Sequence, residues 1–303
     1  MRILFPAFPL DPTSADPDYE IECASAKAAG FTVGLLDLEA LNAGNVSKAV
    51  RRVGADGAEP VLYRGWMLTH EAYVSLDNAL RAKQLSPVTA PDEYVACHHF
   101  PESYEVIRAL TPESYWVSIE NAFSEDTLSE VARRFGHSPL VIKDFVKSAK
   151  HYWNEACYVP DAADGRDLEK KVRRLIEIRD LELTGGIVFR RFEELLSVGT
   201  HPNSGMPISL EYRTFVLNGK PLATLPYWEG DYGEHPEPNL EDFESQLSRI
   251  NSPFFTVDFA CTQEGAWRII ELGDAQVAGL PEHADVSAFY TALAAKLISG
   301  PGR

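Results

Sequence analysis

Two carboxylates near the C-terminal end of the chain are spaced to meet on one face of a β-hairpin. Asp258 lies in the apolar run Thr256–Ala260, and Glu271 lies in the run Ile269–Leu272. Both positions are equally far from a turn centred near residues 264–265, so their side chains are expected to stand opposite each other. Like charges this close repel unless a cation separates them, and the pair therefore predicts a cation site.

The donor atoms of this site suit one kind of metal. Asp274 follows the second run and adds a third carboxylate, so the predicted metal ligands are Asp258, Glu271 and Asp274. Oxygen ligands of this kind suit Mg²⁺, which often takes further oxygens from a triphosphate. The alternative interpretation is a pair of edge carboxylates that face solvent.

Cationic side chains upstream complement such a site. Lys143 and Lys147 are four residues apart in the run Leu140–Lys147, which is predicted to be a strand with both lysines on one face. They would attract an anion there, or else form a solvated face. Arg213 lies in another strand-like run and either pairs with Glu211 on the same face or grips a terminal phosphate with its planar guanidinium.

The first 110 residues alternate between strands and helices, which indicates a small parallel sheet. No Gly-x-Gly-x-x-Gly motif follows the first strand, so a dinucleotide fingerprint is absent. The predicted strands are Arg2–Phe5, Phe31–Leu36 and Pro60–Gly65, and the predicted helices are Tyr19–Ala29 and His70–Lys83.

The rest of the chain must position the charged residues. Ser124 is the predicted N-cap and Gly136 the predicted stop of one helix, and Asn218-Gly219 predicts a tight hairpin turn. The expected helices are 124–135, 167–179 and 286–298, and the expected strands are 140–147, 186–192, 210–217, 221–227, 254–261 and 266–272.

Composition sets limits on the class of protein. The 303 residues carry a net charge of −17, which opposes binding to a nucleic-acid backbone. The apolar start of the chain is too short to cross a bilayer. The four cysteines are far apart with no Cys-x-x-Cys spacing, which is typical of free thiols in a reducing compartment. We therefore expect a cytoplasmic protein.

The order of these features resembles that of the ATP-grasp superfamily over roughly residues 115–282. The superfamily has a lysine-bearing strand, a mobile loop, an adenine hinge, a phosphate-binding arginine and an acidic hairpin in that order. Here the loop corresponds to Ser148–Cys157 and the hinge to Ile187–Glu193. The phrases Tyr63–Trp66 and Glu271–Leu280 are similar to a bacterial and phage clade named for an arginine and paired lysines.

The resemblance implies an α/β fold of the ATP-grasp type, in which two α+β lobes clasp ATP. The expected division is a small N-terminal α/β lobe at 1–112, a central lobe at 113–200 and a C-terminal lobe at 201–303. ATP and Mg²⁺ are the implied cofactors. The same resemblance allows a homodimer.

The resemblance also assigns roles to residues. Arg213 and Lys147 are the implied catalytic residues that face the transferred phosphoryl group. In most members an asparagine stands two positions after the metal glutamate, where this chain has Gly273, and an acid opens the hinge, where this chain has arginines. The implied ATP-binding residues are Lys143, Lys147, Val188, Arg190, Arg191, Phe192, Glu193 and Arg213.

The activity implied by the resemblance is a ligation of a carboxylate to an amine through an acyl phosphate. The expected substrate is an amino acid, a peptide or another small carboxylate. Arg64, at a strand end, would pair with a substrate carboxylate, or would instead be a buried arginine bound to backbone. Two alternatives to a ligase remain open, a small-molecule kinase on the same scaffold and a non-catalytic nucleotide-binding protein.

Overall fold

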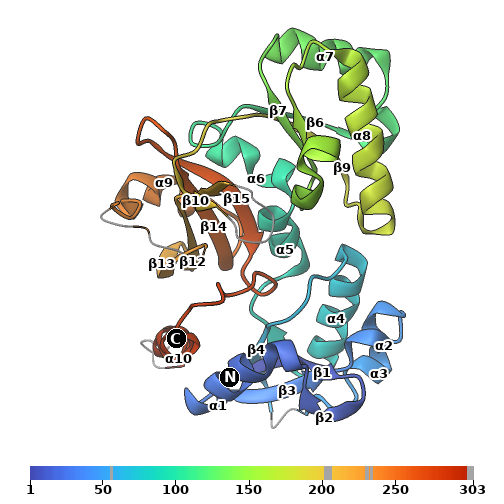
Figure 1. Cartoon of the computed structure of the whole chain (residues 1–303). Coiled ribbons are helices and arrows are strands. Elements are labelled where there is room, and N and C mark those ends of the chain that lie inside the picture. The colour runs from blue at the N-terminus through green and yellow to red at the C-terminus, as the bar shows by residue number, and fades with distance from the viewer. Residues whose placement is uncertain (55–56, 201–206, 229–231, 233–234, 299–303) are drawn as a thin grey trace.

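The computed structural model of the chain describes residues 1–54, 57–200, 207–228, 232 and 235–298. The chain forms three lobes. The N-terminal lobe lies at the bottom of Figure 1, and the central lobe lies at the upper right. Within the described residues, the strands form one five-stranded sheet, two four-stranded sheets and one two-stranded sheet.

The N-terminal sheet is parallel, as predicted. Strand β1 pairs in parallel with β3 and β4, β4 pairs in parallel with β5, and the short β2 returns antiparallel along the end of β1. The strands are β1 (Arg2–Phe8), β2 (Asp11–Ala15), β3 (Thr32–Leu36), β4 (Glu59–Tyr63) and β5 (Leu85–Pro87). The helices are α1 (Glu20–Ala28), α2 (Leu38–Asn42), α3 (Val46–Ala49) and α4 (His70–Ala82).

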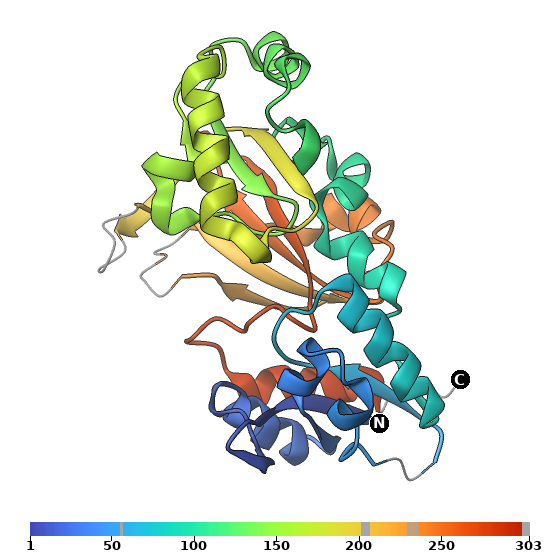
Figure 2. The ribbon, with the colours of Figure 1, turned by 90° about the vertical axis from the view of Figure 1, so that its right-hand side faces the viewer.

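Two helices absent from the expectations above connect the lobes. Helices α5 (Pro91–His98) and α6 (Phe100–Ile107) follow α4, and the three run as a column from the N-terminal lobe toward the central lobe (Figure 2). Both α5 and α6 also contact β15 of the C-terminal sheet. The apolar residues of these two helices keep a helical spacing over only a short stretch, and prolines interrupt it. A periodicity analysis therefore does not detect the helices.

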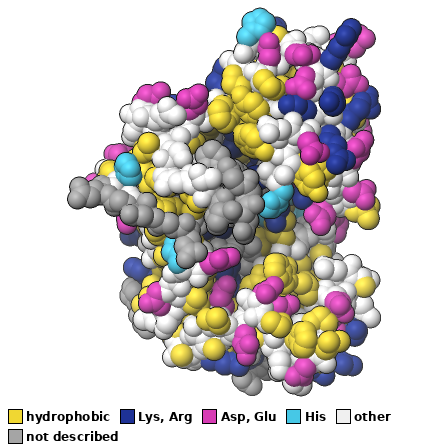
Figure 3. Space-filling view, viewed as in Figure 1, with side chains coloured by type: hydrophobic (Ala, Val, Ile, Leu, Met, Phe, Trp, Pro, Cys, Tyr) yellow, Lys and Arg dark blue, Asp and Glu magenta, His cyan; other side chains and the backbone are white. Residues whose placement is uncertain are grey.

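The central sheet is antiparallel and has the strand order β6-β9-β7-β8. Its strands are β6 (Ser114–Ser118), β7 (Leu140–Asp144), β8 (Tyr158–Val159) and β9 (Gly186–Arg191). Helices α7 (Glu125–Phe135) and α8 (Gly165–Arg179) cover one face with apolar side chains. The Ser124 hydroxyl accepts the Thr127 N–H, and Gly136 ends the helix at φ 56°, as the sequence predicted. Lysine and arginine side chains gather on the outer surface of this lobe (Figure 3).

The C-terminal sheet has the order β13-β12-β14-β15, with every neighbouring pair antiparallel. Asn218 and Gly219 both have positive φ, 51° and 72°, which confirms the predicted hairpin turn. The strands are β12 (Glu211–Leu217), β13 (Lys220–Pro226), β14 (Phe254–Cys261) and β15 (Trp267–Asp274); β10 (Ser197–Thr200) and β11 (Pro207–Ser209) form a separate pair, and α9 is Glu244–Leu247.

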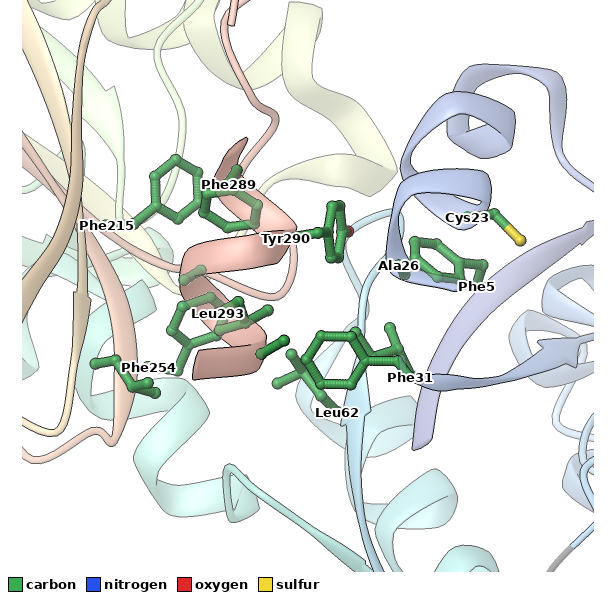
Figure 4. Packing of buried hydrophobic residues seen from close by; sticks show 14 of the residues in the cluster. Phe5, Cys23, Ala26, Phe31, Leu62, Phe215, Phe254, Phe289, Tyr290 and Leu293 are labelled. Carbon is green, nitrogen blue, oxygen red and sulfur yellow. The ribbon is translucent and has the colours of Figure 1, made fainter. Parts of the chain in front are cut away.

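The last helix joins the two ends of the chain in one core. Helix α10 (Val286–Leu297) lies between the C-terminal sheet and the N-terminal lobe (Figure 4). Phe289 faces Phe215 of β12 with ring centroids 4.9 Å apart, while Tyr290 contacts Phe31 of the N-terminal lobe at 6.5 Å. The N-terminal lobe therefore shares its core with the sheet that carries the acidic hairpin.

Two further expectations concern the whole chain. All four cysteines are free and buried, as expected from their spacing. Among the described residues, no helix combines the length and hydrophobicity that crossing a membrane requires.

Arg64 holds the N-terminal lobe to the segment that follows β15. Its guanidinium is 1% exposed and pairs with Glu22, with Nε–Oε2 at 2.7 Å and Nη2–Oε1 at 3.1 Å. It also donates to the carbonyl oxygens of Ala275 and Ala278. The Tyr290 hydroxyl donates to the same Glu22 carboxylate. The expected contact of Arg64 with a substrate carboxylate is therefore replaced by the alternative, a buried arginine bound to backbone and to an internal acid.

We expect Arg64→Leu to lower the free energy of unfolding by about 3–5 kcal/mol, because it leaves Glu22 buried without its counter-charge. Urea unfolding of the full chain measures this. The matched control is Arg108→Leu, since Arg108 and its partner Glu105 are both largely exposed, and its effect should stay within about 0.5 kcal/mol. Equal losses in both variants would contradict the role of Arg64 in fastening the lobe.

Candidate functional site

The two hairpin carboxylates stand directly opposite each other, as the sequence predicted. Asp258 of β14 and Glu271 of β15 are register partners. The register shifts between Asp258 and Phe259, because Phe259 pairs with Ile269 and Ile270 forms a bulge. The bulge brings Glu271 onto the face of Asp258 even though the turn lies slightly before the position assumed from the sequence.

Each carboxylate is held by a cation. Arg213 is the register partner of Asp258 in β12 and grips it with both arms of the guanidinium, with Nε–Oδ1 at 2.8 Å and Nη2–Oδ2 at 2.7 Å. Lys143, from β7 of the central sheet, donates to Glu271 at 3.0 Å. The Lys143–Glu271 pair therefore crosses from one sheet to the other. Arg213 pairs with Asp258 rather than with Glu211, the partner considered from strand alternation.

The electrostatics of this cluster favour the ionised form of Glu271. Burial raises the pKa of Glu271, but the positive charges of Lys143, Lys150 and Arg213 outweigh burial and lower that pKa to about 2. Burial lowers the pKa of Arg213, but Asp258 outweighs it and the pKa rises above its ordinary value. Glu271 and Arg213 therefore keep their charges at neutral pH.

A third cation, which the sequence analysis did not select, faces the same cluster. Lys150 lies after β7 in a 3₁₀ turn (Lys150–Tyr152), with its Nζ 6.0 Å from the centre of the Tyr227 ring. Desolvation of its ammonium group lowers the pKa of Lys150. The negative charges of Glu211 and Glu271 outweigh this effect, and the pKa is raised overall. Among the described residues Lys150 has no salt-bridge partner and it remains accessible to solvent, so its charge is available to an anion.

Lys147 is placed differently from the prediction. Strand β7 ends at Asp144, whose carboxylate accepts the backbone N–H groups of Val146 and Lys147 and so turns the chain. Lys147 is exposed in this turn and does not lie on the strand face of Lys143. The side-chain capping by Asp144, which also pairs with Arg179 at 3.0 Å, is the physical reason for the earlier end of the strand.

Asp274 does not join the predicted metal ligands. It is three positions after Glu271, on the opposite face of β15, and its side chain is fully buried. Its carboxylate accepts the backbone N–H of Gln276 at 2.9 Å and lies near the thiol of Cys97. Burial raises the pKa of Asp274 to about 7. The alternation of strand side chains separates it from the Asp258–Glu271 pair.

Arg190, from the predicted adenine hinge, lies between the two sheets. Its Nη1 donates to the carbonyl oxygen of Ile270 in β15 at 2.6 Å, and its guanidinium stacks over Phe100 at 4.5 Å. Burial lowers its pKa to about 10. Its Nε and Nη2 atoms are buried and have no hydrogen-bond partner within the described chain. Unpaired donors are costly inside a protein, so these two N–H groups could bind an acceptor that the described chain does not supply.

The other predicted hinge residues are not gathered at one point. Val188 is buried against α6, and Arg191 points to the outer side, where it binds Ser138 and Glu113. Phe192 contacts Tyr158, with ring centroids 5.2 Å apart, and Glu193 pairs with Arg268 at 3.3 Å. Of the two hinge arginines, Arg190 therefore lies between the central and C-terminal sheets, and Arg191 pairs with Ser138 and Glu113 instead.

With this geometry in place, the comparisons with known proteins identify the class. Residues 134–293, more than half of the chain, match the family model described as ATP-grasp domain, R2K clade family 3. The chain therefore belongs to this ATP-grasp family. No curated protein matches it in sequence.

Solved structures share the fold over almost the whole chain. D-cycloserine synthetase DcsG has a TM-score of 0.60 at 12% identity, covering 98% of this chain and 100% of that one. A RimK domain ATP-grasp protein from Sphaerobacter thermophilus has 0.61 at 12%, with the same coverage. The ATP-grasp ligase PsnB, complexed with a minimal precursor, Mg and ADP, has 0.55 at 12%, covering 98% and 97%. At these identities the likeness establishes the ATP-grasp fold.

The residues present fit a metal–nucleotide pair. The described part of the chain contains no group of three or more acidic, histidine or cysteine side chains that would hold a metal alone. Two opposed carboxylates are nevertheless a common set for Mg²⁺, since phosphate oxygens complete its coordination. The unpaired N–H groups of Arg190 and the available charge of Lys150 supply donors for an anionic, hydrogen-bonding ligand.

Asp274 generates a pH prediction. Its pKa of about 7 lies above the ordinary value of 3.8, so between about pH 4 and 7 the folded state holds a proton that the unfolded state has lost. Stability conferred by this proton is complete at low pH and is lost as pH rises through 7. We expect Asp274→Asn to match wild type near pH 4 and to be more stable by a few kcal/mol near pH 8.

Urea unfolding at a series of pH values measures this effect. Asp242→Asn is the control, because Asp242 is exposed, and its difference from wild type should not change across the same range. A difference for Asp274→Asn that shrinks as pH rises would contradict the buried, protonated state.

Proposed function

We propose that the protein is an ATP- and Mg²⁺-dependent carboxylate–amine ligase that acts through an acyl phosphate on an amino acid, a peptide or another small carboxylate. The observation that carries this proposal is the charged cluster between the sheets, in which Lys143 and Arg213 pair with Glu271 and Asp258. Membership of the ATP-grasp family supports the use of ATP. PsnB, a structural neighbour, binds a precursor, Mg and ADP.

The paired charges suit an exchange of partners on nucleotide binding. Asp258 and Glu271 would hold Mg²⁺, which supplies charge neutralisation for the phosphates when bound. Lys143 and Arg213 would then turn from the carboxylates to phosphate oxygens. Because each buried charge keeps a counter-charge before and after the exchange, neither state leaves an isolated ion in the cleft.

The roles within this site follow from position. Arg213 is suited to a terminal phosphoryl group, since its planar guanidinium binds oxygens in pairs. Lys150 faces the same cluster from the loop after β7 and would stabilise the charge that develops on the transferred group. We propose Lys150, in place of Lys147, as the second lysine of the site. Arg190 would direct its free N–H groups to the nucleotide.

The test of the proposed function is ADP release from a panel of carboxylate–amine pairs, with the product identified by mass spectrometry. The expected result is ADP formation that requires both the acid and the amine and yields a product joined by an amide bond. The double variant Asp258→Asn/Glu271→Gln should lose Mg²⁺·ATP affinity in calorimetry. ADP release that needs no amine and leaves a phosphorylated acceptor would instead establish a kinase. Absence of ADP release across the panel, with ATP still bound, would establish a non-catalytic nucleotide-binding protein.

The second lysine is tested by paired substitutions. We expect Lys150→Met to reduce ADP formation by about 100-fold, in the range for loss of one preorganised charge at the transferred group. Lys147→Met should reduce it by less than about threefold, because Lys147 lies in the exposed turn. The kcat of each variant is measured at saturating ATP. The reverse order of effects would restore Lys147 to the role assigned from the sequence.

A further inference from the structure

A cavity lies in the N-terminal lobe, separate from the charged cluster. It has a volume of about 260 Å³ and is lined by the end of β1, by the residues after β3, by α2 and α3, and by Trp66 after β4. All three strands are parallel, so their carboxyl ends meet at this edge of the sheet. The chain passes from β1 to β3 on one side and then to β4 on the other. Such a switch point leaves a crevice where ligands bind in open α/β sheets.

The cavity wall carries charges of both signs. Asp37 and Lys48 neutralise each other, with the carboxylate and ammonium 3.2 Å apart. Arg51 and Arg52 also line the cavity; Arg51 lies within electrostatic range of Asp37 and Arg52 within range of Asp11, but neither arginine forms a salt bridge among the described residues. Available cations are informative here because the chain as a whole has a net charge of −17.

Negative charge lies on the same wall. Asp16 and Glu39 line the cavity together with the arginines. Neither carboxylate has a salt bridge within the described residues, although Asp16 accepts the backbone N–H of Asp18. A purely anionic ligand would meet repulsion from these acids, and a purely cationic ligand would meet repulsion from the arginines. A ligand that carries one positive and one negative charge can pair with the acids and with the arginines at the same time.

The remaining wall is apolar. Phe8, Leu38 and Trp66 line it, and Trp66 is 45% exposed although it is a large aromatic residue. Apolar side chains gather at the lower right of Figure 3, over the N-terminal lobe. The Trp66 ring packs edge-on against the Tyr19 ring, with the ring centroids 5.3 Å apart. The backbone carbonyl oxygen of Trp66 accepts a hydrogen bond from the Tyr63 hydroxyl. Trp66 is thus held in place and offers a fixed apolar surface.

Two hydrogen bonds and the backbone segment between them join this wall to the charged cluster. Gly65, next to Trp66, donates its N–H to the carbonyl oxygen of Gln276 at 3.0 Å. The same segment continues to Gly279, whose carbonyl oxygen accepts Arg213 Nη1 at 3.0 Å. A side chain at position 65 would collide with Tyr63 at 2.5 Å, so this contact requires glycine. The segment 275–279 therefore lies between the cavity wall and the residue that grips Asp258.

We propose that this cavity binds a zwitterionic α-amino acid or short peptide with an apolar side chain. Arg51 and Arg52 receive the carboxylate, Asp16 and Glu39 receive the ammonium, and Trp66 with Phe8 receives the side chain. The volume is below the roughly 300–1,000 Å³ of sites for drug-sized ligands, which suits a molecule of this size. The binding does not require ATP. Only the further statement that the ligand is a substrate rests on the proposed function.

The experiment is calorimetric titration of the full chain, without nucleotide, with L-leucine and with L-leucyl-L-leucine. Two ligands each lack one charge of leucine, namely 4-methylpentanoate without the amine and 3-methylbutylamine without the carboxylate. We expect at least one zwitterion to bind about 10-fold or more tightly than both, because each lost charge removes one set of charge-assisted contacts. The tighter of the two zwitterions decides between a free amino acid and a peptide.

Variants connect the binding to this cavity. Arg51→Gln/Arg52→Gln should weaken binding by about 10-fold or more, while Arg108→Gln/Arg133→Gln, two exposed arginines elsewhere, should leave it unchanged. Trp66→Phe should remove the ligand-induced change in tryptophan fluorescence. Binding of 4-methylpentanoate or inorganic phosphate as tightly as leucine would overturn the proposal, and so would no binding by either zwitterion.

The outcome is independent of the proposed function. Asp258→Asn/Glu271→Gln should retain leucine binding even when it no longer binds Mg²⁺·ATP. Zwitterion binding together with an absence of amine-dependent ADP release would support the cavity and refute the ligase. Amine-dependent ADP release without zwitterion binding would support the ligase and refute the cavity.

Discussion

The pairing of opposite charges between two sheets is the constraint on which this structure depends. Asp258 and Glu271 stand opposite each other in a mostly buried hairpin, where a carboxylate without a partner is costly. Arg213 on the neighbouring strand pairs with Asp258, and Lys143 of the central lobe pairs with Glu271. The central sheet must therefore face the C-terminal sheet closely enough for a 3.0 Å contact. Arg190 lies buried between the same two sheets, and two of its guanidinium nitrogens have no hydrogen-bond partner among the described residues.

The N-terminal lobe is fixed to this arrangement by a second set of contacts. Apolar side chains of helix α10 pack against both β12 and the first strands (Figure 4). Arg64 connects the end of β4 to the segment after β15 by a hydrogen bond. That segment also accepts Arg213 at Gly279. The carboxyl edge of the parallel sheet and the charged cluster are thus connected through a few hydrogen bonds. The proposal that one lobe presents a substrate to the other draws on this connection.

Local rules predicted much of the fold and part of the site. Strand alternation placed Asp258 opposite Glu271, and the Asn218-Gly219 turn defined the preceding hairpin. Capping at Ser124 fixed the start of α7. The same alternation rule failed at Lys147, because it assumed a strand that Asp144 ends with its own side chain. Lys150 carried no periodic signal, since it lies in an irregular turn and reaches the cluster only through the approach of the two sheets.

The sequence by itself determined the elements, the parallel sheet of the first lobe, the facing acids and the order of charged residues that resembles an ATP-grasp protein. These depend on interactions between residues near each other along the chain or across one hairpin. The tertiary structure decided which charges meet: Arg213 with Asp258, Lys143 with Glu271, Arg64 with Glu22, and Asp274 with none of the predicted ligands. A long charged side chain has several partners within reach, and only the packing of whole sheets removes the alternatives.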